Sequence, residues 1–131
     1  MIPSIGDVIS VVRALEICRN YQFTYLVERL SDNQDAFKDW TFDGASILAD
    51  KIFAKIFSIP NLIEIALRHD LKYAYGEFNN KSERLLADEQ FRQDLLNDGC
   101  LSWVAQAMYL AVRAFGNFPI KTDFSWGFAR K

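Results

Sequence analysis

The chain has 131 residues, of which 50% are hydrophobic and 15% aromatic, so it can bury the core of one compact domain without disulfide bridges. Its formal net charge is −2, and no run of Lys or Arg is interleaved with aromatic residues. We therefore expect no nucleic-acid partner. The least charged stretch, residues 99–112, is shorter than the roughly 20 apolar residues that cross a bilayer, so we expect no membrane-spanning segment.

The first third of the chain has the periodicity of amphipathic helices. We expect helices over residues 4–19 and 21–30, then a short helical turn over 33–39. The opening segment lacks the basic region and the small-residue cleavage site of a secretory signal, so we expect it to belong to the fold. This predicts a cytoplasmic protein, or one exported by a route without a signal peptide.

The only histidine, His69, lies in the segment 60–76, whose spacing predicts a helix. Residues three and four apart form one inward stripe, so His69 should point into the protein. That stripe comprises Leu62, Ile65, Ala66, His69, Tyr73 and Gly76. Asp70 is rotated from it by about 100° and should face a crevice at the edge of the core. Imidazole titrates near pH 7 unaided, which makes His69 the candidate general base.

The next predicted helix, residues 82–96, carries a carboxylate in an otherwise apolar row. The members of that row are Leu85, Asp88, Phe91 or Arg92, and Leu95. Burying an unpaired carboxylate costs several kcal/mol, so an inward Asp88 needs a donor on the facing helix, and His69 is the candidate. A carboxylate that accepts one imidazole N–H leaves the other nitrogen free to take a proton from water. The sequence therefore predicts a His–Asp dyad that activates water.

Each of these residues also has a plain structural interpretation. A single histidine in a helix most often packs in a core or faces solvent, and Tyr73 fits a core position equally well. Asp70 can pair with Arg68 or Lys72 on the solvent side. Asp88 is solvated if the helical phase is shifted by one residue.

The end of the chain predicts one further helix and an irregular tail. The uncharged residues 99–112 predict a buried helix. The tail over 117–131 is aromatic, and its rings either fold back over the core, which we favour, or anchor the protein to a lipid surface. These aromatic residues are Phe124, Trp126 and Phe128. Because strand signals are nearly absent, we expect an all-α fold in a single domain over residues 1–131.

Four segments follow one another in an informative order. They are an aspartate-centred turn over 40–46; His69-Asp70-x-x-Tyr73; Ala87-Asp88-x-x-Phe91, preceded by Asn80-Lys81-Ser82; and a terminal segment with Trp103 and Tyr109 that ends in Phe115-Gly116. Together, over roughly residues 37–116, they resemble the phospholipase A2 superfamily and are most similar to its prokaryotic and fungal branch. Standing alone, the Asp-Gly pair of the first segment is also an ordinary turn.

The resemblance implies a phospholipase A2-like fold with two antiparallel core helices, in which His69 is the general base, Asp88 orients it and Tyr73 braces that carboxylate. It also implies calcium as cofactor, a hard cation that prefers oxygen ligands. The implied ligands are Asp43, Gly44 through its backbone carbonyl, and Asp70. The implied reaction is hydrolysis of a carboxylic ester of a glycerophospholipid by His-activated water with calcium assistance, at a membrane surface that the protein contacts peripherally.

The chain departs from the family where a disulfide usually ties the calcium loop to the catalytic helix, because Ala45 and Ala66 occupy the two places. The paired absence predicts a reducing compartment. Gly44 is the only glycine near the expected metal, which predicts weak calcium binding or none. Cys18 and Cys100 show no metal or redox spacing and are expected to be separate thiols, with a bridge as the minor alternative. Two alternatives to an active enzyme stay open: an idle module of the same fold that binds lipid or protein, and a toxin or effector held by a partner protein.

Overall fold

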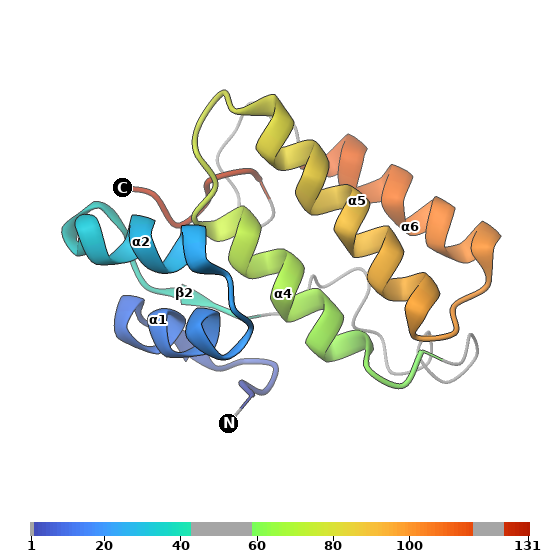
Figure 1. Ribbon diagram of the computed structural model, residues 1–131, viewed down its shortest axis with the longest axis horizontal. Helices are drawn as coiled ribbons and strands as arrows, with labels where there is room; N and C mark the ends of the chain where they lie inside the picture. The colour runs from blue at the N-terminus through green and yellow to red at the C-terminus, as the bar shows by residue number, and fades with distance from the viewer. Residues whose placement is uncertain (1, 43–58, 117–124) are drawn as a thin grey trace.

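The structure is a computed structural model that describes residues 2–42, 59–116 and 125–131. These residues form the helices α1 (Val11–Asn20), α2 (Thr24–Asp32), α4 (Leu62–Ala74), α5 (Lys81–Asn97) and α6 (Ser102–Phe115), a 3-10 turn η1 (Gln34–Ala36), and the strands β1 (Val8–Ile9) and β2 (Trp40–Thr41). Figure 1 shows α4 between the α1–α2 pair and the α5–α6 pair, with α5 antiparallel to both α4 and α6. The expected helical class is confirmed for this part of the chain.

The first helix begins later than its periodicity predicts, at Val11 instead of residue 4. The chain turns before it, because Gly6 has a φ of 97° and the Asp7 carboxylate accepts a hydrogen bond of 2.9 Å from the backbone N–H of Ser4. Ser10 then caps α1 by accepting from a backbone N–H of the first turn. Local hydrogen bonds of short side chains therefore override the helical spacing of the apolar residues here.

The sequence predicts no strand, yet β1 and β2 pair antiparallel, with Ile9 opposite Trp40. Ile9 and Trp40 are both buried, whereas the neighbouring Val8 is 58% exposed. Side chains alternate between the two faces of a strand, so Ile9 faces the core and Val8 faces away from it. This two-residue pairing is compatible with the expected all-α class, and the weak strand signals of the sequence did not locate it.

The middle helices agree closely with their sequence patterns, since α4 and α5 lie within two residues of the predicted ranges 60–76 and 82–96 at each end. The last helix is only partly buried. Val104 and Met108 of α6 pack in the core, but Trp103 is 65% exposed and Leu110 is 55% exposed. An uncharged segment therefore does not mean a buried helix here, because α6 covers only one side of α5 (Figure 1).

The core lies on both sides of α4. Leu67 and Leu71 of this helix pack with α1, α2 and β2, whereas Leu62 and Ile65 pack with α5 and α6. Each of the two clusters also contains a free, buried cysteine, Cys18 in the first and Cys100 in the second. α4 is consequently the central element of the fold, and polar residues on it need partners inside the protein.

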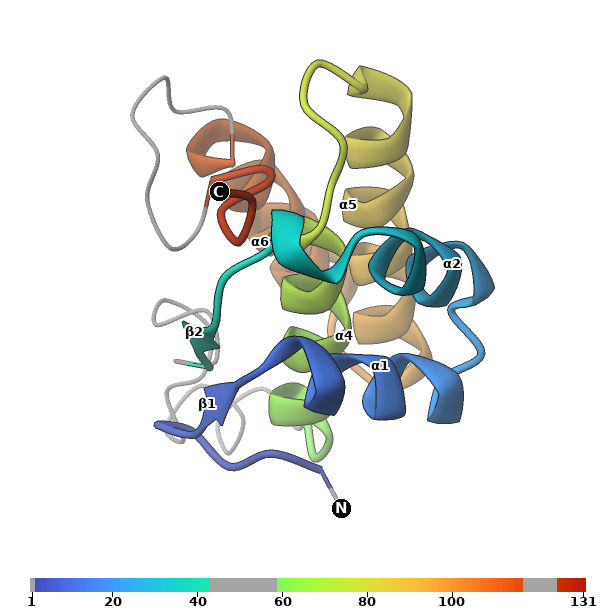
Figure 2. The ribbon, with the colours of Figure 1, turned by 90° about the vertical axis from the view of Figure 1, so that its left-hand side faces the viewer.

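The described tail residues, 125–131, return to the C-terminal end of α4 (Figure 2). Phe128 is 3% exposed and its ring packs edge-on against Trp40 at a centroid distance of 5.2 Å. Trp126 packs edge-on against Tyr73 at 5.0 Å. The favoured expectation that the aromatic tail covers the core is confirmed for these two residues, while Phe124 lies outside the described residues.

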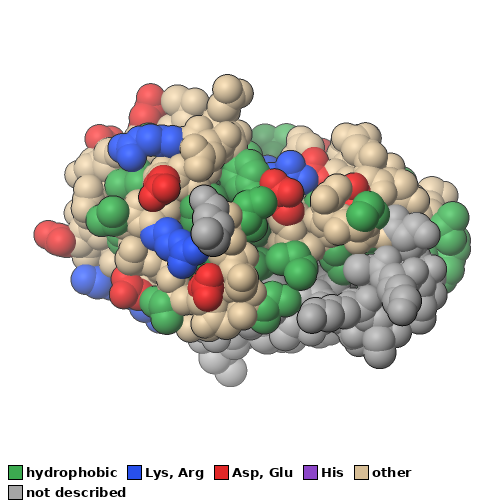
Figure 3. Space-filling model, turned by 90° about the horizontal axis from the view of Figure 1, so that it is seen from below, with side chains coloured by type: hydrophobic (Ala, Val, Ile, Leu, Met, Phe, Trp, Pro, Cys, Tyr) green, Lys and Arg blue, Asp and Glu red, His purple; other side chains and the backbone are tan. Residues whose placement is uncertain are grey.

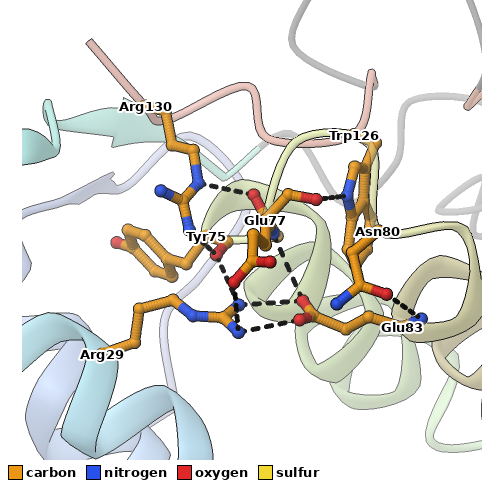
Figure 4. Close-up of polar contacts among 8 residues, drawn as sticks. Arg29, Tyr75, Glu77, Asn80, Glu83, Trp126 and Arg130 are labelled. Atoms are coloured by element: carbon orange, nitrogen blue, oxygen red, sulfur yellow. Dashed lines mark hydrogen bonds and ion pairs between the residues drawn. The ribbon is translucent and has the colours of Figure 1, made fainter.

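Two arginines hold the end of α4 (Figure 4). Arg29 donates a hydrogen bond of 2.9 Å to the carbonyl of Tyr75, and Arg130 donates to the carbonyls of Tyr75 at 3.2 Å and Gly76 at 2.6 Å. Arg29 also forms a two-point ion pair with Glu83 of α5, at 2.8 and 2.7 Å. Cations at a helix C-terminus satisfy its free carbonyls, so these contacts fix how the chain leaves α4 and enters α5.

The face of the molecule shown in Figure 3 carries both charged and hydrophobic side chains. Acidic and basic side chains are interspersed on it, and hydrophobic side chains gather across the middle. No helix among the described residues combines the length and the apolar character that a membrane span needs.

Candidate functional site

α4 directs His69 into the protein. The side chain is 5% exposed, and the residues predicted to share its inward stripe are all buried. Those residues are Leu62, Ile65, Ala66, Tyr73 and Gly76. Most other residues of α4 are buried as well, so it is the contact with Asp88 that shows His69 facing α5.

The facing side of α5 differs by one position from the expected row. Asp88 is fully buried and Phe91 and Leu95 are buried beside it, as expected, but Leu85 is 37% exposed. Arg84 takes the inward place of Leu85, since it lies one helical turn before Asp88 and its guanidinium reaches that carboxylate, with Nη1 3.6 Å from Oδ2. The inward row of α5 therefore contains two charged residues, Arg84 and Asp88, where the apolar periodicity indicated only Asp88.

Asp88 brings His69 and Tyr73 together on one oxygen. Nε2 of His69 lies 2.8 Å from Oδ1 of Asp88, and the Tyr73 hydroxyl donates to the same atom at 2.7 Å. Since an ionised carboxylate only accepts, Nε2 carries the hydrogen of this bond. The structure thus places these three predicted residues in one buried hydrogen-bonded group.

The other oxygen of Asp88 contacts cations that the sequence reasoning missed. Arg113 of α6 donates to Oδ2 at 2.8 Å. Arg84 donates to the Tyr73 hydroxyl at 3.2 Å in addition to its ion pair with Oδ2. The i,i+4 spacing of Arg84 and Asp88 was a usable signal, whereas nothing in the sequence connects Arg113 with Asp88 before α6 is packed on α5.

The electrostatics of this group keep Asp88 charged and His69 neutral. Burial raises the pKa of Asp88, but the hydrogen bonds that it accepts outweigh burial and hold the pKa below its usual range. Burial lowers the pKa of His69, and the bond to Asp88 restores only part of that shift. Burial and the charge of Asp88 raise the pKa of Tyr73, which therefore stays a hydroxyl donor.

The imidazole of His69 lies between two rings. Its centroid is 4.4 Å from that of Tyr73 and 4.6 Å from that of Phe91, both tilted by 37°. These contacts fix the ring plane, and no described residue forms a hydrogen bond with Nδ1. With Nε2 used by Asp88, Nδ1 is the nitrogen that remains for a proton from a ligand or water.

A close contact with α6 also limits the space around Tyr73. A β-carbon built on Gly116 would lie 2.5 Å from the Tyr73 hydroxyl oxygen and 2.8 Å from Nη1 of Arg84. Real β-carbons do not approach other atoms so closely, so glycine is required here for steric reasons.

Of the residues expected to bind calcium, only Asp70 lies within the described residues. It is 9% exposed on α4, next to His69, and its carboxylate is the kind of oxygen donor that calcium prefers. Asp43 and Gly44 lie outside the described residues, as does Ala45, the expected neighbour of Ala66. Within the described ranges, no three His, Cys, Asp or Glu side chains are grouped closely enough to hold a metal ion.

No protein-family model, no curated protein and no solved structure matches this chain. Function is therefore inferred from the site itself. The chemistry that the described residues supply is a neutral, buried imidazole whose Nε2 is held by an ionised carboxylate.

Proposed function

We propose that this protein is a phospholipase A2-like hydrolase that cleaves a carboxylic ester of a glycerophospholipid at a lipid surface. The observation that carries the proposal is the buried 2.8 Å contact between Nε2 of His69 and Oδ1 of Asp88 across the antiparallel helices α4 and α5. The Tyr73 hydroxyl on the same oxygen supports it, because it is the bracing contact that the resemblance implies.

The chemistry proceeds through the free nitrogen of His69. Nδ1 takes a proton from water while the water oxygen bonds to the ester carbonyl carbon. The imidazolium then gives that proton to the departing alkoxide as the carbon–oxygen bond breaks, so that a fatty acid and an alcohol leave and His69 is neutral again. Asp88 stays ionised throughout and stabilises the imidazolium, as a carboxylate does in other His-based hydrolases.

Calcium is part of this proposal. The residues that would hold the ion are Asp70, Asp43 and Gly44 through its backbone carbonyl. Calcium prefers oxygen ligands, and the buried carboxylate of Asp70 supplies such oxygens. When bound, calcium supplies Lewis-acid polarisation of the ester carbonyl.

A catalytically idle module of the same fold that binds a lipid or a protein is the second candidate. Two observations favour it: His69 is 5% exposed, and Arg113 and Arg84 compete with it for the charge of Asp88. A carboxylate that is already paired with cations stabilises an imidazolium less, which weakens His69 as a base.

The deciding experiment measures fatty-acid release from mixed phospholipid vesicles, with calcium and with a chelator. We expect release by the wild type, and at least a hundredfold less by His69→Gln, whose amide can still donate to Asp88 and preserve the fold. Arg92→Gln is the matched control, because it removes a polar surface contact of α5 to Gln106 and should leave the rate unchanged. Vesicle binding by the wild type without any release in either buffer would reject the hydrolase and favour the idle module.

A further inference from the structure

A groove of about 530 Å³ lies between the turn that joins α1 to α2 and the first half of α5. It is separate from the His69 site, since neither His69 nor Asp88 lines it. Its apolar lining comprises Phe23, Leu86 and Ala87, and the polar residues Gln22, Asn80 and Gln90 also line it. Leu86 is 66% exposed, so this lining is open to a ligand.

Lys72 of α4 lines this groove from below the surface. The residue is 9% exposed, and its ammonium lies 4.8 Å from the centroid of the Phe23 ring. It forms no hydrogen bond or ion pair with any described residue. A cation–π contact does not neutralise the ammonium charge, so Lys72 has no negatively charged partner at hydrogen-bond distance among the described residues.

The carboxylates near Lys72 are already engaged with other cations. Glu83, which also lines the groove, forms a two-point ion pair with Arg29, and Asp94 lies 3.7 Å from Arg68. Asp94 and Arg68 act on Lys72 through space in opposite directions, and burial lowers the pKa of the amine. One positive charge of the groove is thus left uncompensated.

We propose that this groove binds a monocarboxylate with an apolar tail, with its head group on Lys72 and its tail along Phe23, Leu86 and Ala87. The charges favour a ligand with one negative charge, because Lys72 is the single cation among the described lining residues and Glu83 repels a second negative charge. The apolar lining selects a tail that can cover exposed Leu86. This site goes beyond the proposed hydrolysis and does not depend on it.

The test is calorimetric titration of the full chain with laurate below its micelle concentration. We expect one laurate per chain and at least about tenfold weaker binding to Lys72→Met, which keeps the apolar stem and removes the charge. Lys38→Met is the matched control, because Lys38 is exposed and does not line the groove. The affinity of this variant for laurate should equal that of the wild type. Leu86→Ser should also weaken binding, and dodecyl phosphate should bind less tightly than laurate at a pH where it is dianionic.

A laurate bound at the His69 site would behave differently, since its affinity would change in His69→Gln and not in Lys72→Met. That outcome overturns the proposal, as does equal affinity of the wild type and Lys72→Met or the absence of laurate binding. If Lys72→Met fails to fold, lysine acetylation of the wild type, with and without laurate, is measured by mass spectrometry instead. We expect laurate to slow acetylation of Lys72 and not of Lys38. An unchanged rate of Lys72 acetylation would reject the site.

Discussion

Arg113 donates a hydrogen bond of 2.8 Å to Oδ2 of Asp88, so that α6 is bound to the same carboxylate that holds His69 of α4. The single fully buried acid of α5 therefore joins three helices. Removing its charge would leave the mostly buried Arg84 and the partly buried Arg113 without their counter-ion, which is more costly than losing one hydrogen bond.

Asp88→Asn should lower the free energy of unfolding by about 3–5 kcal/mol, because Arg113 and Arg84 lose the carboxylate that compensates their charge. Urea denaturation at pH 7 measures this change. Glu89→Gln makes the same chemical change on the exposed side of α5 and should stay within about 0.5 kcal/mol of the wild type. Equal losses in both variants would show that Asp88 is not the electrostatic centre of the helices.

The pKa of His69 should lie below 6.5 in the folded protein, because burial disfavours the imidazolium more than Asp88 stabilises it. Since the chain has one histidine, its ring resonances in an NMR titration are assigned without ambiguity. Lys72→Met should raise this pKa, because the charge of Lys72 opposes protonation of His69. A pKa above 6.5 would mean that the bond to Asp88 dominates burial.

The lowered pKa of His69 also predicts how stability depends on pH. Below about pH 6.5 the unfolded chain binds a proton at this residue before the folded protein does, so the unfolding free energy should fall as pH decreases from about 6.5 towards the folded pKa. The slope from this group is at most about 1.4 kcal/mol per pH unit. Denaturation of the wild type and His69→Gln between pH 8 and 5 should show a shallower slope in the variant, and parallel curves would contradict the prediction.

Gly116→Ala should cost about 1–3 kcal/mol of stability, since the added methyl group meets the Tyr73 hydroxyl and Arg84. The backbone of Gly116 has a φ of −67°, which alanine adopts freely, so the effect is steric. Thermal denaturation of a double-mutant cycle with Tyr73→Phe tests the contact. The cost of Gly116→Ala should be smaller in the Tyr73→Phe background, and an unchanged cost would place the clash elsewhere.

Arg29→Met should destabilise the protein by about 1–3 kcal/mol, because it leaves the partly buried Glu83 without its ion-pair partner and removes one of the two arginine donors to the carbonyl of Tyr75. Arg92→Met is the comparison, since Arg92 bonds an exposed Gln106 and contacts the Tyr109 ring but has no ion pair, so its loss should cost at most about 1 kcal/mol. In urea denaturation, Arg29→Met combined with Glu83→Gln should cost less than the sum of the single changes. Additive losses would reject the ion pair as the source of the effect.

The sequence by itself determined the two central helices and the inward direction of His69, Asp88 and Tyr73. Apolar spacing at three and four residues continues through 60–76 without a competing local signal, so the helical phase follows from periodicity alone. The need to pair a buried carboxylate then pointed from Asp88 to His69, which the structure places 2.8 Å apart. The same periodicity was wrong around Gly6 and Asp7, where the chain turns. The positive φ of Gly6 and the hydrogen bond from Ser4 to Asp7 do not appear in the spacing of apolar residues.

Only the tertiary structure decided which cations reach Asp88 and which cation is left without a partner. Arg113 is 25 residues away from Asp88, and it becomes a donor because α6 packs on α5. Lys72 occupies an unspecified position of the His69-Asp70-x-x-Tyr73 motif, so the sequence does not distinguish it from its neighbours. It is buried because α4 is covered on both sides, and nearby carboxylates pair with Arg29 and Arg68. Such pairings depend on distances between helices, and periodicity describes only one helix at a time.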